Sequence, residues 1–449
     1  MNFTITNGLI VNADSSFKSD ILCVDGKISR IEKNIAVPDL ESSIIDASDC
    51  LILPGGIDTH VHLHLPTPTG FSADDFTTGS KAAIAGGTTS LIDFVTPRRG
   101  QSIIEALHLR RQEAANSLCD VKLHVSPVEW TDQTEQEIIH CIKNEGIKSF
   151  KVYMAYQSTI GLRQEDIFKV MKVVGKHGGI VTMHCEMDEI IEKNRKQLLS
   201  QGKTVPKFHP LSRPNAVESE AVKNAIALAE KAECPLYIVH VSTHEALDHI
   251  HKAQSKGQPV YAETCPQYLL LDESLYDQPF DQACAYVMSP PLRKKEDREA
   301  LWQAIADGII LTVGTDHCPF TLEQKRLGLL DFTKIPNGAG GVEHRMSLLY
   351  THGVLKNRIS LQKFVEITST NAAKIFGWYP QKGNIQEGSD ADLLVWDPNA
   401  KQIISTKTHH QHCDLNVYEG FDVKGLPKYT FISGTLKWNA DDADLADFH

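Results

Sequence analysis

Short apolar segments alternate with segments of helical periodicity from about Leu51 onward, and this alternation constrains the fold more than any other feature of the sequence. Residues 217–233 have the helical pattern, with Val222, Ile226 and Ala229 at four- and three-residue spacing. Alternating strands and helices are typical of a parallel sheet, and eight such units predict an α/β chain with a closed (β/α)8, TIM-like barrel. The eight expected strands are LILPGGIDTHVH, TTSLIDF, VKLHVS, SFKVYM, GGIVTMHCE, PLYIVHVS, PVYAETCP and GIILTVGTDH.

Both ends of the chain have a different pattern. The N-terminal residues form short alternating segments with turns at Asn7-Gly8 and Asp25-Gly26, and GNIQEGSDADLLVWDP and YTFISGTLKWN repeat this style near the C-terminus. The N-terminal set is too small to fold alone, so we expect the two sets to form one small β domain. The predicted division is 1–52 and 381–449 for this β domain and 53–380 for the barrel.

The composition excludes several classes of function. A formal net charge of -12, with no basic run longer than Arg293 to Lys295, argues against nucleic acid as a partner. No apolar run approaches the roughly 18 residues of a membrane span, and the N-terminal segment lacks the features of a signal peptide. Ten scattered cysteines without CxxC spacing indicate reduced thiols. We therefore expect a cytoplasmic protein that binds neither nucleic acid nor membrane.

Metal-binding residue types occur at or near the ends of several predicted strands. In a parallel barrel these ends converge on one face, where active sites form. A single histidine there is more often a hydrogen-bonded core residue, but histidines at i and i+2 of a strand share a face and can bind one ion such as zinc. The residues are His60 and His62 in the first strand, Lys151 in the fourth, His184 in the fifth, His240 in the sixth and Asp316 in the eighth.

Lys151 is an unusual residue for an apolar strand, because Phe150 and Val152 flank it. Burial disfavours the ammonium form, and a neutral amine can add carbon dioxide to become an anionic carbamate. Such a group can bridge two cations about 3.5–4 Å apart. The alternative is that Lys151 extends to solvent or pairs with Glu186 or Asp316. The stretch HHQHC, His409 to Cys413, is a further metal-binding candidate, although it lies in a polar connecting segment without a second ligand cluster nearby.

Several motifs together resemble the dihydropyrimidinase and hydantoinase branch of the amidohydrolase superfamily. They are GGIDTHVH, SFKVYMAY, YIVHVS, ETCPQYLLLD, MSPPLR, GTDHCPF and IPNGAGGVEHRM, and with GSDADLLVWDP they cover most of the chain. The segments HPLSRP and IPNG favour this branch over dihydroorotases, as do Leu63 and His64 where dihydroorotases usually have an arginine.

The resemblance implies a barrel flanked by a β-sandwich from both termini, a homotetramer, and two divalent metal ions, usually zinc, with manganese as an alternative. It implies His60, His62 and Asp316 on one ion and His184 and His240 on the other. Lys151, as N6-carboxylysine, would bridge the two ions.

A mechanism follows from this implied site. A hydroxide held by the two metals would attack an amide carbonyl of a hydantoin or a 5,6-dihydropyrimidine and give an N-carbamoyl amino acid. Asp316 would accept the proton and transfer it to the leaving nitrogen, and Tyr156 would donate a hydrogen bond to the oxyanion. Ser289 and Asn337 would hold the cyclic ureide. Structural roles stay open for Tyr156 as a buried strand cap and for Ser289 and Asn337 as turn residues.

The substrate is less constrained than the chemistry. The segments LHLPTPTGFSADDF and YQSTIG match no single substrate type of this branch, and HCE at His184 also resembles dihydroorotases and allantoinases. Allantoinase, or another cyclic imide hydrolase, is therefore the alternative activity. A non-catalytic scaffold relative is a third interpretation, disfavoured because every expected ligand is present.

Overall fold

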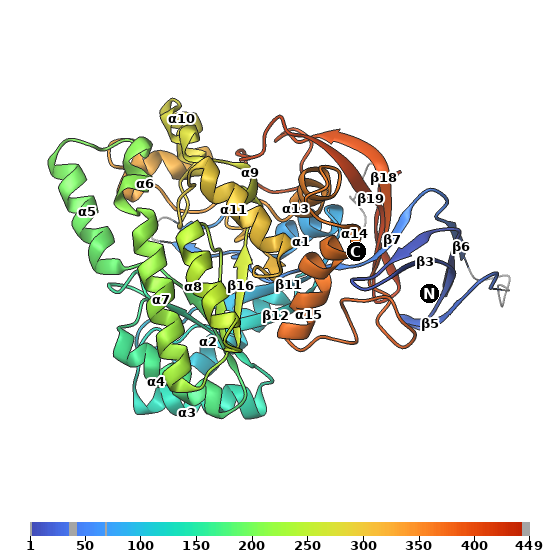
Figure 1. Cartoon of the computed structure of the whole chain (residues 1–449), viewed down its shortest axis with the longest axis horizontal. Helices are drawn as coiled ribbons and strands as arrows, with labels where there is room; N and C mark the ends of the chain where they lie inside the picture. The colour runs from blue at the N-terminus through green and yellow to red at the C-terminus, as the bar shows by residue number, and fades with distance from the viewer. Residues whose placement is uncertain (1, 36–42, 68–69, 442–449) are drawn as a thin grey trace.

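The computed structural model describes residues 2–35, 43–67 and 70–441. It contains a parallel barrel on one side and the paired ends of the chain on the other (Figure 1). The barrel strands are β8 (Gly56–Asp58), β11 (Thr88–Val95), β12 (Asp120–Val125), β13 (Ser149–Tyr153), β14 (Ile180–His184), β15 (Leu236–Ile238), β16 (Val260–Thr264) and β17 (Thr312–Val313).

These eight strands form one sheet in chain order, and neighbouring strands pair in parallel. The sheet nearly closes, because a parallel bridge joins Val61 to His317. Arg345 adds to this closure by donating to the carbonyl oxygens of Ile57, 2.9 Å away, and Val313, 3.0 Å away. Each strand overlaps one of the eight predicted segments, and only β11 and β12 extend beyond theirs, by one residue each, so the predicted barrel is confirmed.

Helices follow the strands and cover the outside of the barrel (Figure 1). The longest, α7, buries Ala221, Val222, Ala225 and Ala229 along one face and ends at Glu233 in the left-handed conformation. The helices are α1 (Phe76–Ala85), α2 (Ile103–Ala114), α3 (Asp132–Asn144), α4 (Gln164–Lys176), α5 (Asp188–Ser200), α6 (His209–Ser212), α7 (Asn215–Ala232), α8 (His244–Gln254), α9 (Pro266–Leu270), α10 (Phe280–Ala283), α11 (Lys295–Ala306), α12 (Leu322–Lys325), α13 (Arg345–Leu349), α14 (Leu361–Val365) and α15 (Asn371–Ile375).

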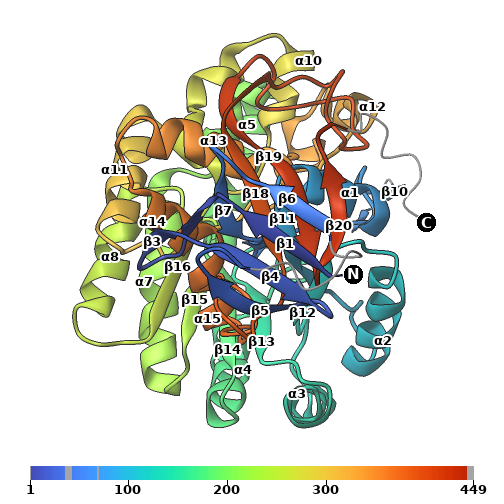
Figure 2. The same cartoon turned by 90° about the vertical axis from the view of Figure 1, so that its right-hand side faces the viewer.

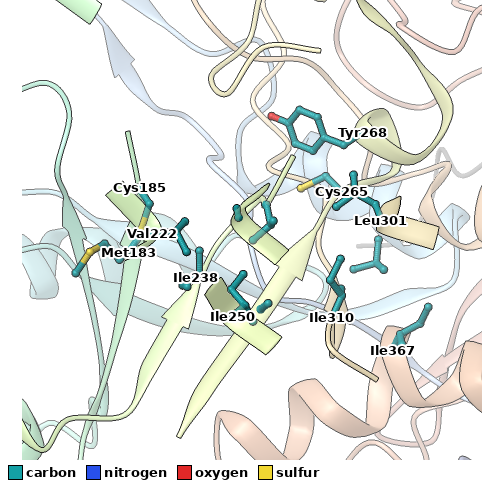
Figure 3. Packing of buried hydrophobic residues seen from close by; sticks show 14 of the residues in the cluster. Met183, Cys185, Val222, Ile238, Ile250, Cys265, Tyr268, Leu301, Ile310 and Ile367 are labelled. Carbon is teal, nitrogen blue, oxygen red and sulfur yellow. The ribbon is translucent and has the colours of Figure 1, made fainter. Parts of the chain in front are cut away.

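The main core fills the space between strands and helices. Met183 and Ile238 of the barrel contribute to the same cluster as Val222 of α7, Ile250 of α8 and Leu301 of α11 (Figure 3). Most of the ten cysteine thiols are buried, and Cys185 and Cys265 pack inside this cluster as small apolar side chains. No helix among the described residues is long and apolar enough to cross a membrane.

The two ends of the chain form the second part of the molecule (Figure 2). One sheet has the order β5-β4-β1-β6 and the other the order β20-β19-β18-β7-β2-β3, which joins strands from both termini. Phe3 of one sheet stacks on Phe431 of the other, with ring centroids 4.6 Å apart, so the sheets pack as the expected sandwich. The strands are β1 (Phe3–Thr6), β2 (Leu9–Val11), β3 (Ser16–Lys18), β4 (Asp20–Val24), β5 (Lys27–Glu32), β6 (Ser43–Asp46), β7 (Leu51–Pro54), β18 (Leu393–Ile403), β19 (Asp422–Ile432) and β20 (Thr435–Asn439).

The first predicted barrel segment is divided between the two parts. Leu51–Pro54 forms β7 and pairs antiparallel with β18, whereas Gly56–Asp58 forms β8 and begins the barrel. Gly55 lies at this change of sheet, where an added Cβ would meet Thr89 Oγ1 at 2.1 Å. Glycine is therefore required for the chain to pass so close to β11. The small hairpin β9 (Pro66–Thr67) and β10 (Gly70–Phe71) follows the first barrel strand.

Candidate metal centre and active site

His60, His62 and Asp316 converge where the first and last barrel strands meet. His60 Nε2 lies 3.2 Å from His62 Nε2 and 3.1 Å from Asp316 Oδ1, and His62 Nε2 lies 3.2 Å from the same carboxylate oxygen. In a tetrahedral zinc site, ligand atoms about 2 Å from the ion are roughly 3.3 Å from one another. The three side chains therefore fit a divalent cation.

The proton on His60 is placed by a buried carboxylate behind it. His60 Nδ1 lies 2.9 Å from Glu263 Oε1, so we assign the proton to Nδ1 and a lone pair to Nε2. Tyr237 donates to Glu263 Oε2 over 2.8 Å, and Thr59 donates to the same oxygen. Burial lowers the pKa of His60 well below its usual value, although Asp316 acts in the opposite direction. A neutral imidazole of this kind is a metal ligand.

His184 and His240 form a second convergent pair. His184 Nδ1 lies 3.0 Å from His240 Nε2, and the His60 and His240 ring centroids are 5.4 Å apart, which places this pair beside the first three side chains. On its other side, His184 Nε2 lies 2.8 Å from Glu186 Oε2. With the His184 proton directed to Glu186, the Nδ1 lone pair is available to a cation.

Glu186 itself is ionised by a buried arginine. Arg213 forms an ion pair with Glu186 Oε2, and both side chains are fully buried. Burial acts to raise the pKa of Glu186, but the Arg213 guanidinium and the His184 hydrogen bond lower this pKa to about 2. The sequence alternative in which Glu186 neutralises Lys151 is therefore not the arrangement observed, because Arg213 occupies that carboxylate.

Lys151 lies within electrostatic range of both ligand sets. Its side chain is 0% exposed, and Nζ has no hydrogen-bond partner among the described residues. Burial lowers the pKa of Lys151 to about 8, against the opposing effect of Asp316 and Glu263. Nζ lies 5.0 Å from the ring centroid of Tyr153 and 5.2 Å from that of Phe94. Burying an unpaired amine in this position lowers the stability of the fold, which indicates a chemical role for Lys151.

Tyr156 follows β13 and faces the second histidine pair. Its backbone is left-handed, with φ of 62°, and its ring centroid is 5.3 Å from that of His184. Arg213 Nη2 lies 3.5 Å from the phenol oxygen. Because the phenol accepts from this arginine, its own proton is free for another acceptor.

Ser289 and Asn337 are brought together from two separate loops. Ser289 Oγ donates to Asn337 Oδ1 over 2.8 Å, and Asn337 Nδ2 donates to the carbonyl oxygen of Ile335 over 3.0 Å. Among the described residues, neither residue uses its own backbone N–H or C=O in a hydrogen bond. These backbone groups are therefore available to a ligand.

The histidines of the stretch His409 to Cys413 each contact a different partner. His409 Nε2 lies 2.9 Å from the carbonyl oxygen of Cys413, and His410 Nδ1 lies 2.9 Å from Glu343 Oε1. The backbone of His412 donates to Asp74. Within the described residues, close groups of three potential metal ligands occur at His60, His62 and Asp316 and at His244, Glu245 and Asp297, and not in this stretch.

Sequence reasoning missed Glu263 and Arg213. Glu263 is the one acidic residue in the apolar strand VYAET, and this isolated charge was the available signal. Arg213 lies in HPLSRP, a segment that indicates the family but not a role for its arginine. Both contact residues that are distant in sequence, so local patterns do not reveal these contacts.

A family model and individual relatives all match the chain over most of its length. The model of the Amidohydrolase family matches residues 51–437. The chain is 41% identical to a dihydropyrimidinase of Dictyostelium discoideum, with 97% of this chain and 87% of that protein covered. It is 42% identical to a D-hydantoinase of Geobacillus stearothermophilus, with 97% and 92% covered.

Solved structures agree with these relatives. The structure of dihydropyrimidinase from Brevibacillus agri NCHU1002 superposes with a TM-score of 0.96 at 40% identity, covering 98% of this chain and 95% of that one. An L-hydantoinase from Arthrobacter aurescens has a TM-score of 0.88 at 30% identity, covering 98% and 96%. Similarity therefore extends over nearly the whole of each chain.

Proposed function

The chain belongs to the amidohydrolase family, in its dihydropyrimidinase and hydantoinase group, and we propose that it opens a hydantoin or 5,6-dihydropyrimidine ring to an N-carbamoyl amino acid. The observation that carries this proposal is the convergence of His60, His62 and Asp316 beside His184 and His240. Lone pairs and a carboxylate repel one another when they meet without a cation between them. The donor set therefore fits two divalent ions, one held by the first three residues and one by the second pair.

Lys151 completes this donor set as a bridging carbamate in our proposal. The uncharged Nζ adds carbon dioxide: a nitrogen–carbon bond forms, one proton leaves to solvent, and the amine becomes an anionic group with two oxygen donors. A lowered pKa of about 8 makes the uncharged amine accessible at neutral pH, and no hydrogen-bond partner within the described part of the chain occupies Nζ. The added negative charge would offset part of the cationic charge of the metals.

When bound, two divalent cations would supply a water of lowered pKa and polarise a substrate carbonyl. Asp316 directs Oδ1 at the histidines and is 15% exposed, so Oδ2 is the atom proposed to take a proton from the attacking water. The same atom would deliver that proton to the leaving ring nitrogen.

Tyr156 would donate its phenol proton to the oxygen that gains charge, since Arg213 Nη2 already donates to the phenol oxygen. The backbone groups of Ser289 and Asn337 would bind the opposite edge of the cyclic ureide. A ureide presents alternating N–H and C=O groups, which backbone N–H and C=O groups complement.

The test is a substrate panel measured together with metal content. Purified protein supplied with zinc or manganese and bicarbonate is assayed with dihydrouracil, phenylhydantoin, allantoin and a simple cyclic imide. We expect two metal ions per chain and turnover of dihydrouracil, phenylhydantoin or both. Turnover of allantoin or the imide alone would assign the alternative activity. Less than one metal per chain with no turnover of any compound would support a non-catalytic protein.

A further inference from the structure

Lys325, the last residue of α12, is a buried cation whose hydrogen bonds, among the described residues, all go to backbone carbonyl groups, and its Nζ also lies 5.6 Å from the ring centroid of Phe320. It is 1% exposed, and its Nζ donates to the carbonyl oxygens of Val287 at 2.9 Å, Pro336 at 2.7 Å and Gly338 at 2.7 Å. Three donors on the ammonium match three acceptors. Among the described residues, no carboxylate forms an ion pair with this ammonium.

The three carbonyls belong to the two loops that carry Ser289 and Asn337. Val287 precedes Ser289 by two residues, and Pro336 and Gly338 lie on either side of Asn337. One side chain therefore joins both loops directly behind the backbone groups that we assign to substrate. The Gly338 N–H also donates to Val287 over 3.1 Å, which closes the same junction.

The second loop is in turn fixed against the strand end that carries Asp316. Cys318, two residues beyond Asp316, donates its N–H to Ala339 over 2.9 Å. Gly338 has φ of 145°, and an added Cβ would meet the carbonyl oxygen of Cys318 at 2.4 Å. These contacts, which do not involve Lys325, hold the Asn337 loop next to the strand end that carries Asp316.

This arrangement is a costly way to gain stability. A buried ammonium with only neutral acceptors lacks the charge neutralisation that a carboxylate provides. Burial lowers the pKa of Lys325 to about 8, which records this cost. The ammonium nevertheless holds three carbonyl groups around one nitrogen. An uncharged side chain has fewer donors and could not bind all three.

We propose that Lys325 is a positioning residue that sets the spacing between the two substrate-binding loops without contacting the substrate. The proposal rests on the function proposed above, because it takes Ser289 and Asn337 as the substrate contacts. Loss of this spacing acts on substrate binding and not on the metal ligands, so its kinetic signature is a change in KM.

The primary test is Lys325→Met, which keeps an unbranched apolar stem of similar length and removes the ammonium donors. For whichever ring substrate the wild-type protein opens, we expect KM to rise about tenfold or more, because hydrogen bonds to charged groups are lost. We expect kcat to stay within about threefold and metal content to be unchanged, the pattern of lost uniform binding. The matched control is Lys382→Met, a buried lysine bound by carboxylates far from these loops, which should lower Tm and leave KM unchanged.

Hydrogen exchange of the substrate-free protein separates this proposal from the proposed activity. The Gly338 amide and the segments 287–290 and 335–341 should exchange faster in Lys325→Met but not in Lys382→Met. If wild-type protein opens no ring, the proposed function fails, whereas exchange still decides whether Lys325 orders these loops. Should Lys325→Met not fold, Lys325→Gln, which keeps two N–H donors, is measured in the same way. Unchanged KM and exchange, or loss of metal and kcat with KM unchanged, would overturn the proposal.

Discussion

Two regions of the molecule bury a lysine and treat its charge in opposite ways. At the junction of barrel and terminal sheets, Lys382 is 7% exposed and forms ion pairs with Asp120, Asp390 and Asp392. Burial acts to lower the pKa of Lys382, but the carboxylates of Asp392 and Asp120 raise it above its usual value. At the barrel mouth, Lys151 is more buried, has no hydrogen-bond partner among the described residues, and has a lowered pKa.

The difference separates structural from chemical use of the same side chain. Carboxylates around Lys382 compensate the desolvation of its ammonium, so that side chain can join two parts of the fold. Around Lys151, the available carboxylates are committed elsewhere: Glu186 to Arg213 and Glu263 to His60 and Tyr237. An amine left without a partner is suited to lose its proton and react.

Replacing Lys151 by alanine should have the largest effect. Without a bridging group, we expect loss of metal and a fall in activity of a thousandfold or more, on the order of the several kcal/mol that metal catalysis contributes. Added acetate or propionate should restore part of both, because a short carboxylate can occupy the vacated position. Metal analysis and initial rates check this, and two tightly held ions without added acid would contradict the bridging role.

Replacing Lys382 by methionine should act on stability alone. Removal of the ammonium leaves the buried carboxylate of Asp392 uncompensated, which costs about 3 kcal/mol in free energy of unfolding. Denaturant unfolding of metal-free protein measures this loss. The value of kcat/KM, assayed well below the melting temperature, should equal that of wild type. A large fall in kcat/KM in a folded variant would contradict the purely structural role of Lys382.

Replacing Tyr156 by phenylalanine should lower kcat by roughly a hundredfold, the usual cost of one lost oxyanion donor. Metal content should not change, because the phenol is not among the proposed ligands. A matched control is Tyr418→Phe, which removes a buried hydroxyl that bonds to Gln267 outside the ligand set. Equal rates for Tyr156→Phe and wild type would assign Tyr156 the purely structural role.

The smallest predicted effect is on how the free energy of unfolding falls at acid pH. Arg213 and His184 lower the pKa of Glu186 in the folded protein from its usual 4.5 to about 2, so its contribution to stability is present above pH 4.5 and is lost as pH falls toward 2. Between pH 5 and 3 this amounts to roughly 2 kcal/mol. Over this pH range, the free energy of unfolding of metal-free wild type should fall by about 2 kcal/mol more than that of Glu186→Gln. Denaturant unfolding measures both values. Parallel pH profiles would show that Arg213 does not depress this pKa.

Much of the barrel could be predicted because each strand has its own apolar run and each helix its own period. The division of the first segment could not, since Leu51–Pro54 and Gly56–Asp58 are both buried and follow one another in a single strand-like run. Which sheet each half joins depends on β18, more than 300 residues away in sequence. Periodicity reports burial and does not identify the partner strand.

The candidate site shows the same limit. His60, His62, His184, His240 and Asp316 were predicted from strand ends, where topology alone brings side chains together. Glu263, Arg213 and Lys325 were not, because their contacts come from segments remote in the chain. Lys325 lies in the polar stretch LEQKR, where a lysine is ordinarily exposed, and only the three-dimensional structure places it behind two loops.

The most direct measurement is a high-resolution crystal structure of metal-loaded, catalytically active protein, inspected at Lys151. Continuous density for a carboxylate group on Nζ, with each oxygen directed at a different metal ion, is the predicted result. An unmodified amine at Nζ, with both metal ions present in active crystals, would contradict the central claim.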